Sequence, residues 1–193
     1  ELEATHPSVA ITPLIGSVQD QPFVAKVLGK FAIDTIYHAA AYKHVPLMEQ
    51  NVMQCITNNV FGTLNTAEAA VVEQVKHFIL VSTDKAVNPT NFMGASKRLA
   101  ELVCQDFART QSVTKFAIVR FGNVIGSDGS ALPYFLNQVK NDLPISLTDK
   151  KMERYFMTIK EACELVLQSI QIKTKNKISF LDMGKPVKII KVI

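Results

Sequence analysis

The fold is indicated most clearly by Phe78-Ile79-Leu80-Val81-Ser82-Thr83-Asp84-Lys85, four apolar residues followed by four polar ones. A short apolar run of this kind is typical of a strand buried on both faces of a parallel sheet. Such sheets carry their ligand-binding residues at the carboxyl ends of the strands. A helical pattern opens near Asn91, and Met93 and Lys97 within it share one helix face because they are four residues apart. Two interpretations stay open from these residues alone: a catalytic site, or a polar turn capped by a helix.

Strands and helices are predicted to alternate along the rest of the chain. We expect further strands at 9–18, 33–37, 116–119 and 178–181, and helices at 22–31, 49–75, 91–109 and 158–170. The last helix begins with a capping box, Thr158-Ile-Lys-Glu161. Gly62, inside the longest predicted helix, costs up to about 1 kcal/mol relative to alanine, so we expect a backbone or a ligand to approach closely there. The alternation predicts an α/β fold with a parallel sheet.

Composition and charge exclude several classes of protein. The chain has 193 residues, of which 48% are hydrophobic and 20% charged, as is usual for one globular domain. The net charge of +4 comes from scattered lysines and arginines, so we expect no nucleic-acid partner. Cys55, Cys104 and Cys163 fall inside helical patterns without close pairing, which predicts buried thiols rather than disulfides or a metal site. No stretch approaches the roughly 18 consecutive apolar residues of a membrane-spanning helix.

Polar or small residues follow four of the predicted strands, at 16–20, 38–44, 82–85 and 120–130. Because the carboxyl ends of parallel strands meet at one edge of a sheet, these segments predict a single active-site edge. The three alanines at 39–41 suit a place where a flat ligand lies against the backbone, although core packing would explain them as well.

Six motifs resemble a known family. They are His38-Ala-Ala-Ala-Tyr-Lys-His-Val-Pro46, Asn59-Val-Phe-Gly-Thr63, Ser82-Thr-Asp-Lys-Ala86, Asn88-Pro-Thr-Asn-Phe-Met-Gly-Ala-Ser-Lys97, Arg120-Phe-Gly-Asn-Val-Ile-Gly-Ser127 and Arg154-Tyr-Phe-Met-Thr158. Together they resemble the extended short-chain dehydrogenase/reductases. Among these, they are most similar to the nucleotide-sugar 4,6-dehydratases of bacterial polysaccharide biosynthesis, which act on UDP-N-acetylglucosamine. The resemblance covers approximately residues 14–188.

The resemblance implies a Rossmann-like parallel sheet with helices on both faces. It also implies that residues 1–193 are the C-terminal part of a single NAD(P)-binding dehydratase domain, with the substrate-binding elements mainly in 120–193. Members of the family begin with a strand, a Gly-rich loop and a helix that hold the cofactor diphosphate. This sequence has no such loop, so we expect the N-terminal Gly-rich βαβ part to be missing and the chain to be part of a larger protein. The implied cofactor is NAD, with NADP as the alternative form.

The resemblance implies catalytic roles for Thr83, Asp84, Lys85, Met93 and Lys97. A 4,6-dehydratase passes a hydride from C4 of the sugar to NAD(P)+, eliminates water across C5–C6 and returns the hydride to C6. Thr83 would hydrogen-bond the C4 oxygen, Asp84 would be the acid at the C6 hydroxyl and Lys85 the base at C5. Lys97 would hold the nicotinamide ribose. Met93 stands where most of the superfamily has tyrosine, and its thioether is only a weak acceptor, so the C4 base would be Asp84 or a water bound to it.

Binding roles are implied in the same way. The cofactor-binding residues would be Ser17, Val18, Ala39, Ala40, Ala41 and Lys97. The substrate-binding residues would be Lys43, His44, Asn123, Ser130 and Arg154. In this last group, the guanidinium fork of Arg154 matches the two oxygens of a diphosphate.

Two alternatives from other classes stay open. One is a UDP-hexose 4-epimerase on the same scaffold, although such an enzyme normally keeps the tyrosine that Met93 replaces. The other is a truncated, non-catalytic nucleotide-sugar-binding module. We expect a UDP-sugar partner and a homo-oligomer formed through the long helices predicted at 49–75 and 97–109. The Met93 pattern resembles the long, membrane-anchored dehydratases, so we expect contact with the bacterial inner membrane, on its cytoplasmic side, only through an N-terminal region that is absent here.

Overall fold

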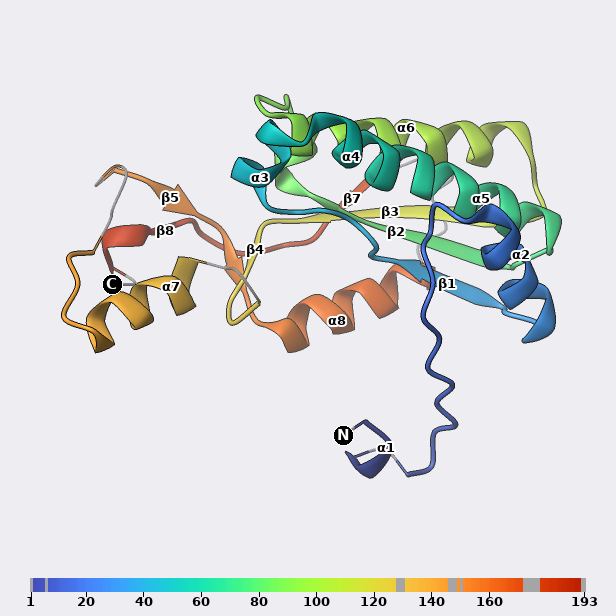
Figure 1. Ribbon diagram of the computed structural model, residues 1–193, viewed down its shortest axis with the longest axis horizontal. Helices are drawn as coiled ribbons and strands as arrows, with labels where there is room; N and C mark the ends of the chain where they lie inside the picture. Colours follow the sequence, from blue (N-terminus) through green and yellow to red (C-terminus); the bar gives the residue numbers. More distant parts are fainter. Residues whose placement is uncertain are drawn as a thin grey trace.

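A four-stranded parallel sheet, in the order β1-β2-β3-β7, forms the centre of the structure. The computed structural model describes residues 2–5, 7–127, 131–145, 149, 151–171 and 178–191. Helices α5 and α6 cover one face of the sheet and α8 the other (Figure 1), which confirms the predicted α/β fold class. The bounds of these elements are β1 Thr35–His38, β2 His77–Thr83, β3 Lys115–Phe121, β7 Ile178–Phe180, α5 Gly62–Val72, α6 Phe92–Thr110 and α8 Ile159–Gln168.

Three helices begin where side chains cap them. Asp20 precedes α2 (Gln21–Lys30) and Asn91 precedes α6, and each accepts the N–H of the third helical residue, at 3.1 and 2.8 Å. The predicted capping box of α8 is confirmed: the N–H of Glu161 donates to the hydroxyl of Thr158 at 3.2 Å, and the N–H of Thr158 donates to the Glu161 carboxylate at 2.7 Å. Local chemistry therefore fixes the starts of these helices.

The prediction of a strand at 9–18 is wrong. Residues 7–20 contain no strand, and the segment is irregular chain that begins away from the sheet and ends beside α5 (Figure 1). A strand exists only through a hydrogen-bonded neighbour, and β1, the nearest edge strand, pairs with β2 alone among the described strands. Gly62 is closely approached, but by a side chain rather than by the expected backbone or ligand: a Cβ there would lie 2.7 Å from Cγ2 of Val18.

The single helix predicted at 49–75 is also wrong, because this stretch contains separate elements. They are α3 (Val45–Gln50), α4 (Val52–Ile56), the π-helical turn η1 (Thr57–Phe61) and α5. Asn51 separates α3 from α4, because its backbone angles, φ −133° and ψ 51°, are not helical. The wide turn η1 carries two buried asparagines, Asn58 and Asn59. Apolar residues continue at helical spacing through both interruptions, so their periodicity does not reveal them.

Short elements gather beyond the carboxyl ends of the main sheet (Figure 1). β4 pairs with β6 in parallel, and β5 pairs with β8 in antiparallel orientation. Two-residue strands leave no periodic signal, so the sequence did not predict them. The elements of this group are β4 Asn123–Val124, β5 Glu153–Arg154, β6 Phe156–Met157, β8 Val187–Lys188, α7 Ala131–Lys140 and η4 Ile189–Lys191. Three other short elements lie elsewhere: α1 Leu2–Thr5, η2 Asp84–Ala86 and η3 Ser169–Gln171.

The main core lies between the sheet and the helices α2, α5 and α6. Phe78 and Phe116, on neighbouring strands, have ring centroids 5.0 Å apart, and small residues of α5 let that helix pack closely on them. Cys55 and Cys104 are buried as predicted, whereas Cys163 is exposed on α8, which corrects the prediction of a third buried thiol. Within the described ranges, no helix is both long and apolar enough to pass through a bilayer.

Gly94, in the first turn of α6, lets the helix pack against η2. A Cβ at this position would lie 2.2 Å from the carbonyl oxygen of Lys85, which is backbone and cannot rotate away. We therefore predict that Gly94→Ala lowers the free energy of unfolding by about 1–3 kcal/mol, as overpacking does. Gly29→Ala is the matched control, because its Cβ would meet only the flexible carboxylate tip of Glu73. This control should be neutral or more stable by up to about 1 kcal/mol. Urea denaturation measures both, and equal stabilities would contradict the role of Gly94.

Candidate functional site

The carboxyl end of β2 places a hydroxyl, a carboxylate and an amine in contact. Thr83 is the last residue of β2, and Asp84 and Lys85 open the turn η2. The Thr83 hydroxyl and the Lys85 ammonium both donate to Oδ1 of Asp84 at 3.0 Å. All three residues are half-buried. The predicted catalytic residues of this segment therefore form one hydrogen-bonded group.

The second oxygen of this carboxylate, Asp84 Oδ2, faces the end of β3. An ideal Cβ at Gly122 would lie 3.2 Å from Oδ2, and equally close to the sulfur of Met183, which follows β7. The N–H of Gly122 donates to that sulfur at 2.8 Å. Among the described residues, Oδ2 accepts no hydrogen bond. The ends of β2, β3 and β7 thus meet at Gly122, and because glycine has no side chain, the Asp84 carboxylate stays accessible there.

Lys97 reaches the same strand from α6. Its side chain is buried, and its Nζ donates to the carbonyl oxygen of Val81 at 2.7 Å, two residues before Thr83. Burial lowers the pKa of Lys97 to about 8, and the carboxylate of Glu101 opposes that shift. The amine is therefore mostly protonated at neutral pH, and among the described residues only one of its three N–H donors has a partner.

Glu101 is a buried carboxylate beside these residues that the sequence analysis missed. Its side chain has no exposed surface, and its carboxylate accepts hydrogen bonds from Ser82, Arg98 and, through two nitrogens, Arg120. One signal was available in the sequence. Glu101 follows Lys97 by four residues, so the two share the helix face that is predicted to lie against the strand.

His38, at the end of β1, is a buried neutral imidazole. Its Nε2 lies 3.0 Å from the Thr63 hydroxyl, which itself donates to the Asn59 carbonyl oxygen at 2.7 Å. Nε2 must therefore carry the hydrogen and donate it. Burial, and then the charge of Lys97, lower the pKa of His38 to about 4.

Asn59 holds the loop that follows β1. Its side-chain oxygen accepts the Tyr42 N–H at 2.7 Å, and its amide nitrogen donates to the Tyr42 carbonyl oxygen at 3.0 Å and to the Ser96 hydroxyl at 3.0 Å. One buried side chain in the π-helical turn thus connects the loop to the first turn of α6. Such turns frequently occur at functional sites. Lys43 and His44 come directly after Tyr42 and are exposed.

Met93 shares the buried side of α6 with Lys97, as predicted, but it is enclosed. Its side chain is 3% exposed and belongs to a cluster with Met48 and Cys55. Packing fully accounts for this thioether.

The remaining predicted binding residues lie on several segments. Ser17 is exposed, Val18 is half-buried against Gly62, Ala39 and Ala40 are exposed, and Ala41 is half-buried. Asn123 follows Gly122 and is half-buried, and its Oδ1 is buried with no hydrogen-bond partner among the described residues. Arg154 is half-buried on β5 and donates to the Glu153 carbonyl oxygen at 2.8 Å. Ser130 lies outside the described residues.

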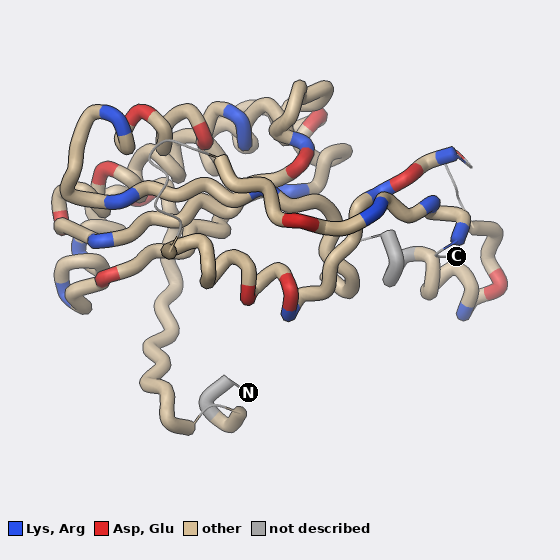
Figure 2. The backbone as a smooth tube through the Cα atoms, turned by 180° about the vertical axis from the view of Figure 1, so that it is seen from behind, with Lys and Arg blue, Asp and Glu red and all other residues tan. Residues whose placement is uncertain are grey.

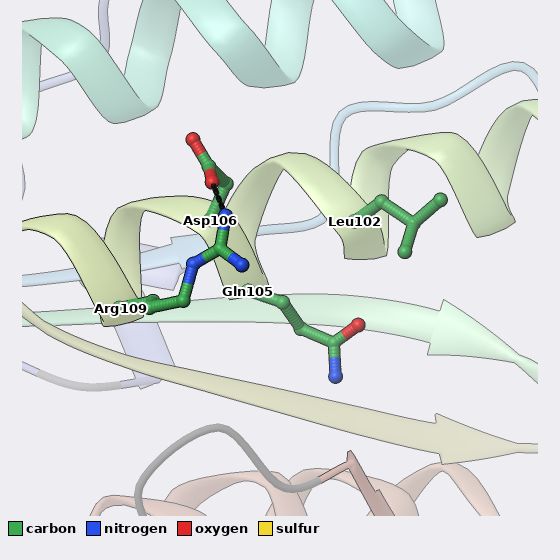
Figure 3. A pocket seen from close by; sticks show the side chains of 4 residues that line it. All are labelled: Leu102, Gln105, Asp106 and Arg109. Carbon is green, nitrogen blue, oxygen red and sulfur yellow. Dashed lines mark hydrogen bonds and ion pairs between the residues drawn. The ribbon is translucent and has the colours of Figure 1, made fainter.

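A separate surface pocket follows the outer side of α6 (Figure 3). It is lined by Leu102, Gln105, Asp106 and Arg109, and it shares no residue with the predicted site. Asp106 and Arg109 form an exposed ion pair at 2.6 Å across this pocket. The pocket therefore belongs to the outer surface of the helix.

Comparison with known proteins places the chain in a family. The profile of a family described as "Polysaccharide biosynthesis protein" matches residues 1–193. The chain belongs to this family. The capsular polysaccharide biosynthesis protein CapD of Staphylococcus aureus is 48% identical over 191 residues, which are 98% of this chain and 32% of CapD.

Two further relatives catalyse different reactions by name. The UDP-N-acetylglucosamine 4,6-dehydratase (inverting) of Campylobacter jejuni is 35% identical over 176 residues, 89% of this chain and 52% of that protein. The UDP-glucose 4-epimerase of Rickettsia felis is 38% identical over 159 residues, 81% of this chain and 46% of that protein. The chain thus spans about a third to a half of the length of these relatives.

Solved structures share the Rossmann-like fold. Pen from Bacillus thuringiensis superposes with a TM-score of 0.89 at 34% identity, covering 97% of this chain and 57% of Pen. The dTDP-glucose 4,6-dehydratase DesIV from Streptomyces venezuelae, a double mutant solved with NAD and DAU bound, has a TM-score of 0.83 at 21% identity, covering 92% of this chain and 60% of DesIV. The predicted extended short-chain dehydrogenase/reductase fold is therefore supported.

The buried imidazole of His38 predicts a pH-dependent stability. Its pKa is about 4 in the folded chain and about 6.5 when unfolded. As the pH falls, the imidazole takes up a proton in the unfolded state first. The free energy of unfolding therefore decreases by about 3 kcal/mol between pH 6.5 and pH 4. We predict that urea denaturation of His38→Asn shows a shallower loss over this range, whereas His44→Asn, at an exposed position, keeps the full loss. Identical pH profiles for wild type and His38→Asn would contradict the assignment.

Proposed function

We propose that the protein dehydrates UDP-N-acetylglucosamine, or a close UDP-sugar, to the 4-keto-6-deoxy sugar, using NAD with NADP as the alternative form. The observation that carries this proposal is the hydrogen-bonded group at the end of β2. One carboxylate oxygen of Asp84 accepts hydrogen bonds from Thr83 and Lys85. The other oxygen faces Gly122, which has no side chain. The relatives named for polysaccharide biosynthesis and for the 4,6-dehydratase reaction support the same choice.

The residues present fit a nicotinamide cofactor. Within the described part of the chain, Lys97 uses one N–H donor on the Val81 carbonyl oxygen, so its other two could bind ribose hydroxyls beside the end of β2. Ala39 and Ala40 leave exposed backbone at the end of the neighbouring strand β1. When bound, the nicotinamide would accept the hydride from C4 of the sugar and return it to C6. Ser17 and Val18 would contact the adenine end, and Val18 packs against Gly62 at the start of α5.

The first proton moves through Thr83 to Asp84. The C4 hydroxyl would donate to the Thr83 hydroxyl, which already donates to Asp84 Oδ1, so the carboxylate receives a proton as C4 becomes a ketone. Met93 is not needed in this step, because its buried sulfur is a weak acceptor. Protonation of Asp84 removes the negative charge that faces the Lys85 ammonium, which favours loss of a proton from Lys85 to solvent.

The elimination then uses both residues of the ion pair. Neutral Lys85 would take the proton from C5, which the ketone has acidified, while Asp84 gives its proton to the C6 oxygen. The C6–O bond breaks, water leaves and a C5–C6 double bond forms. When the hydride reaches C6, Lys85 returns this proton to C5 and then regains from solvent the proton that it lost earlier, which restores the ion pair with Asp84. Each proton removed from the sugar is thereby accounted for by one of two residues whose side chains lie 3.0 Å apart.

The UDP part would bind across the neighbouring loops. Asn123 Oδ1, which has no hydrogen-bond partner within the described ranges, would accept an N–H or O–H of the ligand, and this would relieve the cost of a buried, unsatisfied acceptor. Basic residues gather around β5 and β8 (Figure 2), where Arg154 would pair with the diphosphate. Lys43 and His44 are exposed on the loop that Asn59 holds and would face the sugar. Ser130 keeps its proposed role in UDP binding.

We also propose that residues 1–193 act as part of one dehydratase domain and that copies associate through the outer sides of α5 and α6. Val72, Leu99 and Leu102 expose 71%, 46% and 44% of their surfaces on these helices. The location on the cytoplasmic side of the inner membrane stays a prediction. We expect Leu102→Glu to lower the mass measured by sedimentation, because a charge is poorly tolerated in an apolar interface. An unchanged mass would exclude α6 from any interface.

The epimerase reaction is the second candidate, because a relative of 38% identity carries that name. An epimerase also moves a hydride at C4 but eliminates nothing, so it does not need Asp84 and Lys85. The two reactions separate by product: a 4-keto sugar that has lost water, or a C4 epimer of unchanged mass.

Two substitutions at the ion pair test the dehydratase proposal. In the protein as its gene encodes it, Asp84→Asn and Lys85→Ala should each lower formation of the 4-keto product by about 10²–10⁴-fold, the usual contribution of one acid–base group. UDP affinity measured by calorimetry should stay near the wild-type value. Matched controls are Asp34→Asn and Lys76→Ala, since these residues form an exposed ion pair of 2.8 Å at the opposite end of the sheet. Full turnover in both site variants would contradict the roles of Asp84 and Lys85.

A further inference from the structure

Glu101 lies at the centre of a buried network that joins three elements. Ser82 of β2 and Arg120 of β3 are opposite each other in the parallel register, and α6 places the Glu101 carboxylate between them. The Ser82 hydroxyl and Arg120 Nε each donate to Oε1 at 2.6 Å, and Arg120 Nη2 donates to Oε2 at 2.5 Å. The network thus contacts β2 one residue before Thr83.

The same network also contacts Ala86, the residue that follows the segment 83–85. Arg120 Nη2 lies 3.5 Å from the carbonyl oxygen of Ala86, the last residue of η2, as a second, longer hydrogen bond. Lys97 is one helical turn from Glu101 and binds the Val81 carbonyl oxygen. Residues on both sides of the segment 83–85 are therefore held by groups that share one carboxylate and one helix.

We propose that Glu101 and Arg120 are positioning residues, which fix the two ends of the segment 83–85 relative to Lys97. The proposal rests on the proposed function, since it assigns what keeps Thr83, Asp84 and Lys97 at one sugar and one cofactor. Glu101 would not touch the substrate, because its side chain has no exposed surface. It would act through Ser82 and Lys97.

Stability alone does not account for this pair. Taking two charges out of water costs several kcal/mol each, and buried ion pairs can often be replaced by apolar side chains without loss of stability. A pair with fixed, two-point geometry does, however, set the relative position of the elements that carry it. Because a misplacement of about 1 Å can cost about 10²-fold in rate, holding η2 in place has a catalytic consequence.

Glu101 also has an electrostatic effect on Lys97. The titratable groups that act on this amine among the described residues are Cys104 and Glu101 of α6 and His38 of β1, and both Arg98 and Arg120 pair with Glu101. His38 is neutral above pH 4, and burial raises the pKa of Cys104 to about 12, so both are uncharged at neutral pH. Glu101 is thus the negative charge that keeps Lys97 protonated, and its removal should lower the pKa of Lys97 further.

The test uses Ser82→Ala, Glu101→Gln and the double variant Glu101→Gln with Arg120→Met in the protein as its gene encodes it. Ser82→Ala removes one connection without a change of charge. The double variant removes both buried charges, so it keeps the test usable if Glu101→Gln alone leaves Arg120 unpaired and fails to fold. The control is Glu164→Gln, an exposed carboxylate on α8 that pairs with Lys160 at 3.9 Å.

The first measurement is hydrogen–deuterium exchange, which needs no turnover. The N–H groups of Lys85 and Val87 report on η2, because they donate to Thr83 Oγ1 and to the Asp84 carbonyl oxygen. We expect their exchange to accelerate about tenfold or more in the three variants, with exchange at Phe78 and Ile79 in the same strand unchanged. Equal acceleration at all four positions, or none at any, would overturn the positioning role even if the protein proves to be a dehydratase.

The second measurement is NAD+ affinity as a function of pH. In Glu101→Gln, the pH at which NAD+ affinity falls should shift downward from its wild-type value, whereas in Ser82→Ala it should stay in place. A shift in Ser82→Ala as large as that in Glu101→Gln would contradict the electrostatic part. Wild-type protein that binds no NAD+ at any pH would count against the proposed function, while the exchange data would still decide the positioning role.

Discussion

The parallel pairing of β2 with strands on both sides is the constraint on which the rest of the structure depends. β2 pairs with β1 over four residues and with β3 over seven, so the carboxyl ends of all three strands are forced to one edge. The groups proposed to act on the sugar lie at that edge: Thr83 closes β2, and Asp84 and Lys85 follow it directly, beside the ends of β1 and β3. α6 then packs over the same edge and delivers Lys97 and Glu101.

Much of this arrangement could be predicted from the sequence, because it rests on local signals. The apolar run before Thr83 predicted β2, and the capping residues Asn91 and Thr158 predicted the starts of two helices. The spacing of Met93 and Lys97 predicted that they share a helix side. The contact of Asp84 with both of its neighbours in the chain could also be expected, because the three residues are consecutive.

What the sequence did not predict depends on contacts between distant segments. The segment 9–18 has a strand-like composition, but it pairs with none of the described strands. The π-helical turn is stabilised by Asn59, whose partners Tyr42 and Ser96 are far away in the chain. Glu101 was missed because a glutamate on a long helix is usually solvated, and only Ser82 and Arg120 of the folded sheet explain its burial. These features arise from tertiary structure rather than from periodicity.

We propose that a nicotinamide bound at this edge of the sheet carries a hydride from C4 to C6 of a UDP-sugar, while Asp84 and Lys85 transfer the protons. Incubation of the protein as its gene encodes it with NAD+ and UDP-N-acetylglucosamine deuterated at C4 tests this claim most directly, with the product analysed by mass spectrometry and NMR. The account predicts a product that has lost one water and carries the deuterium at C6. Deuterium retained at C4 in a product of unchanged mass would contradict it and identify an epimerase.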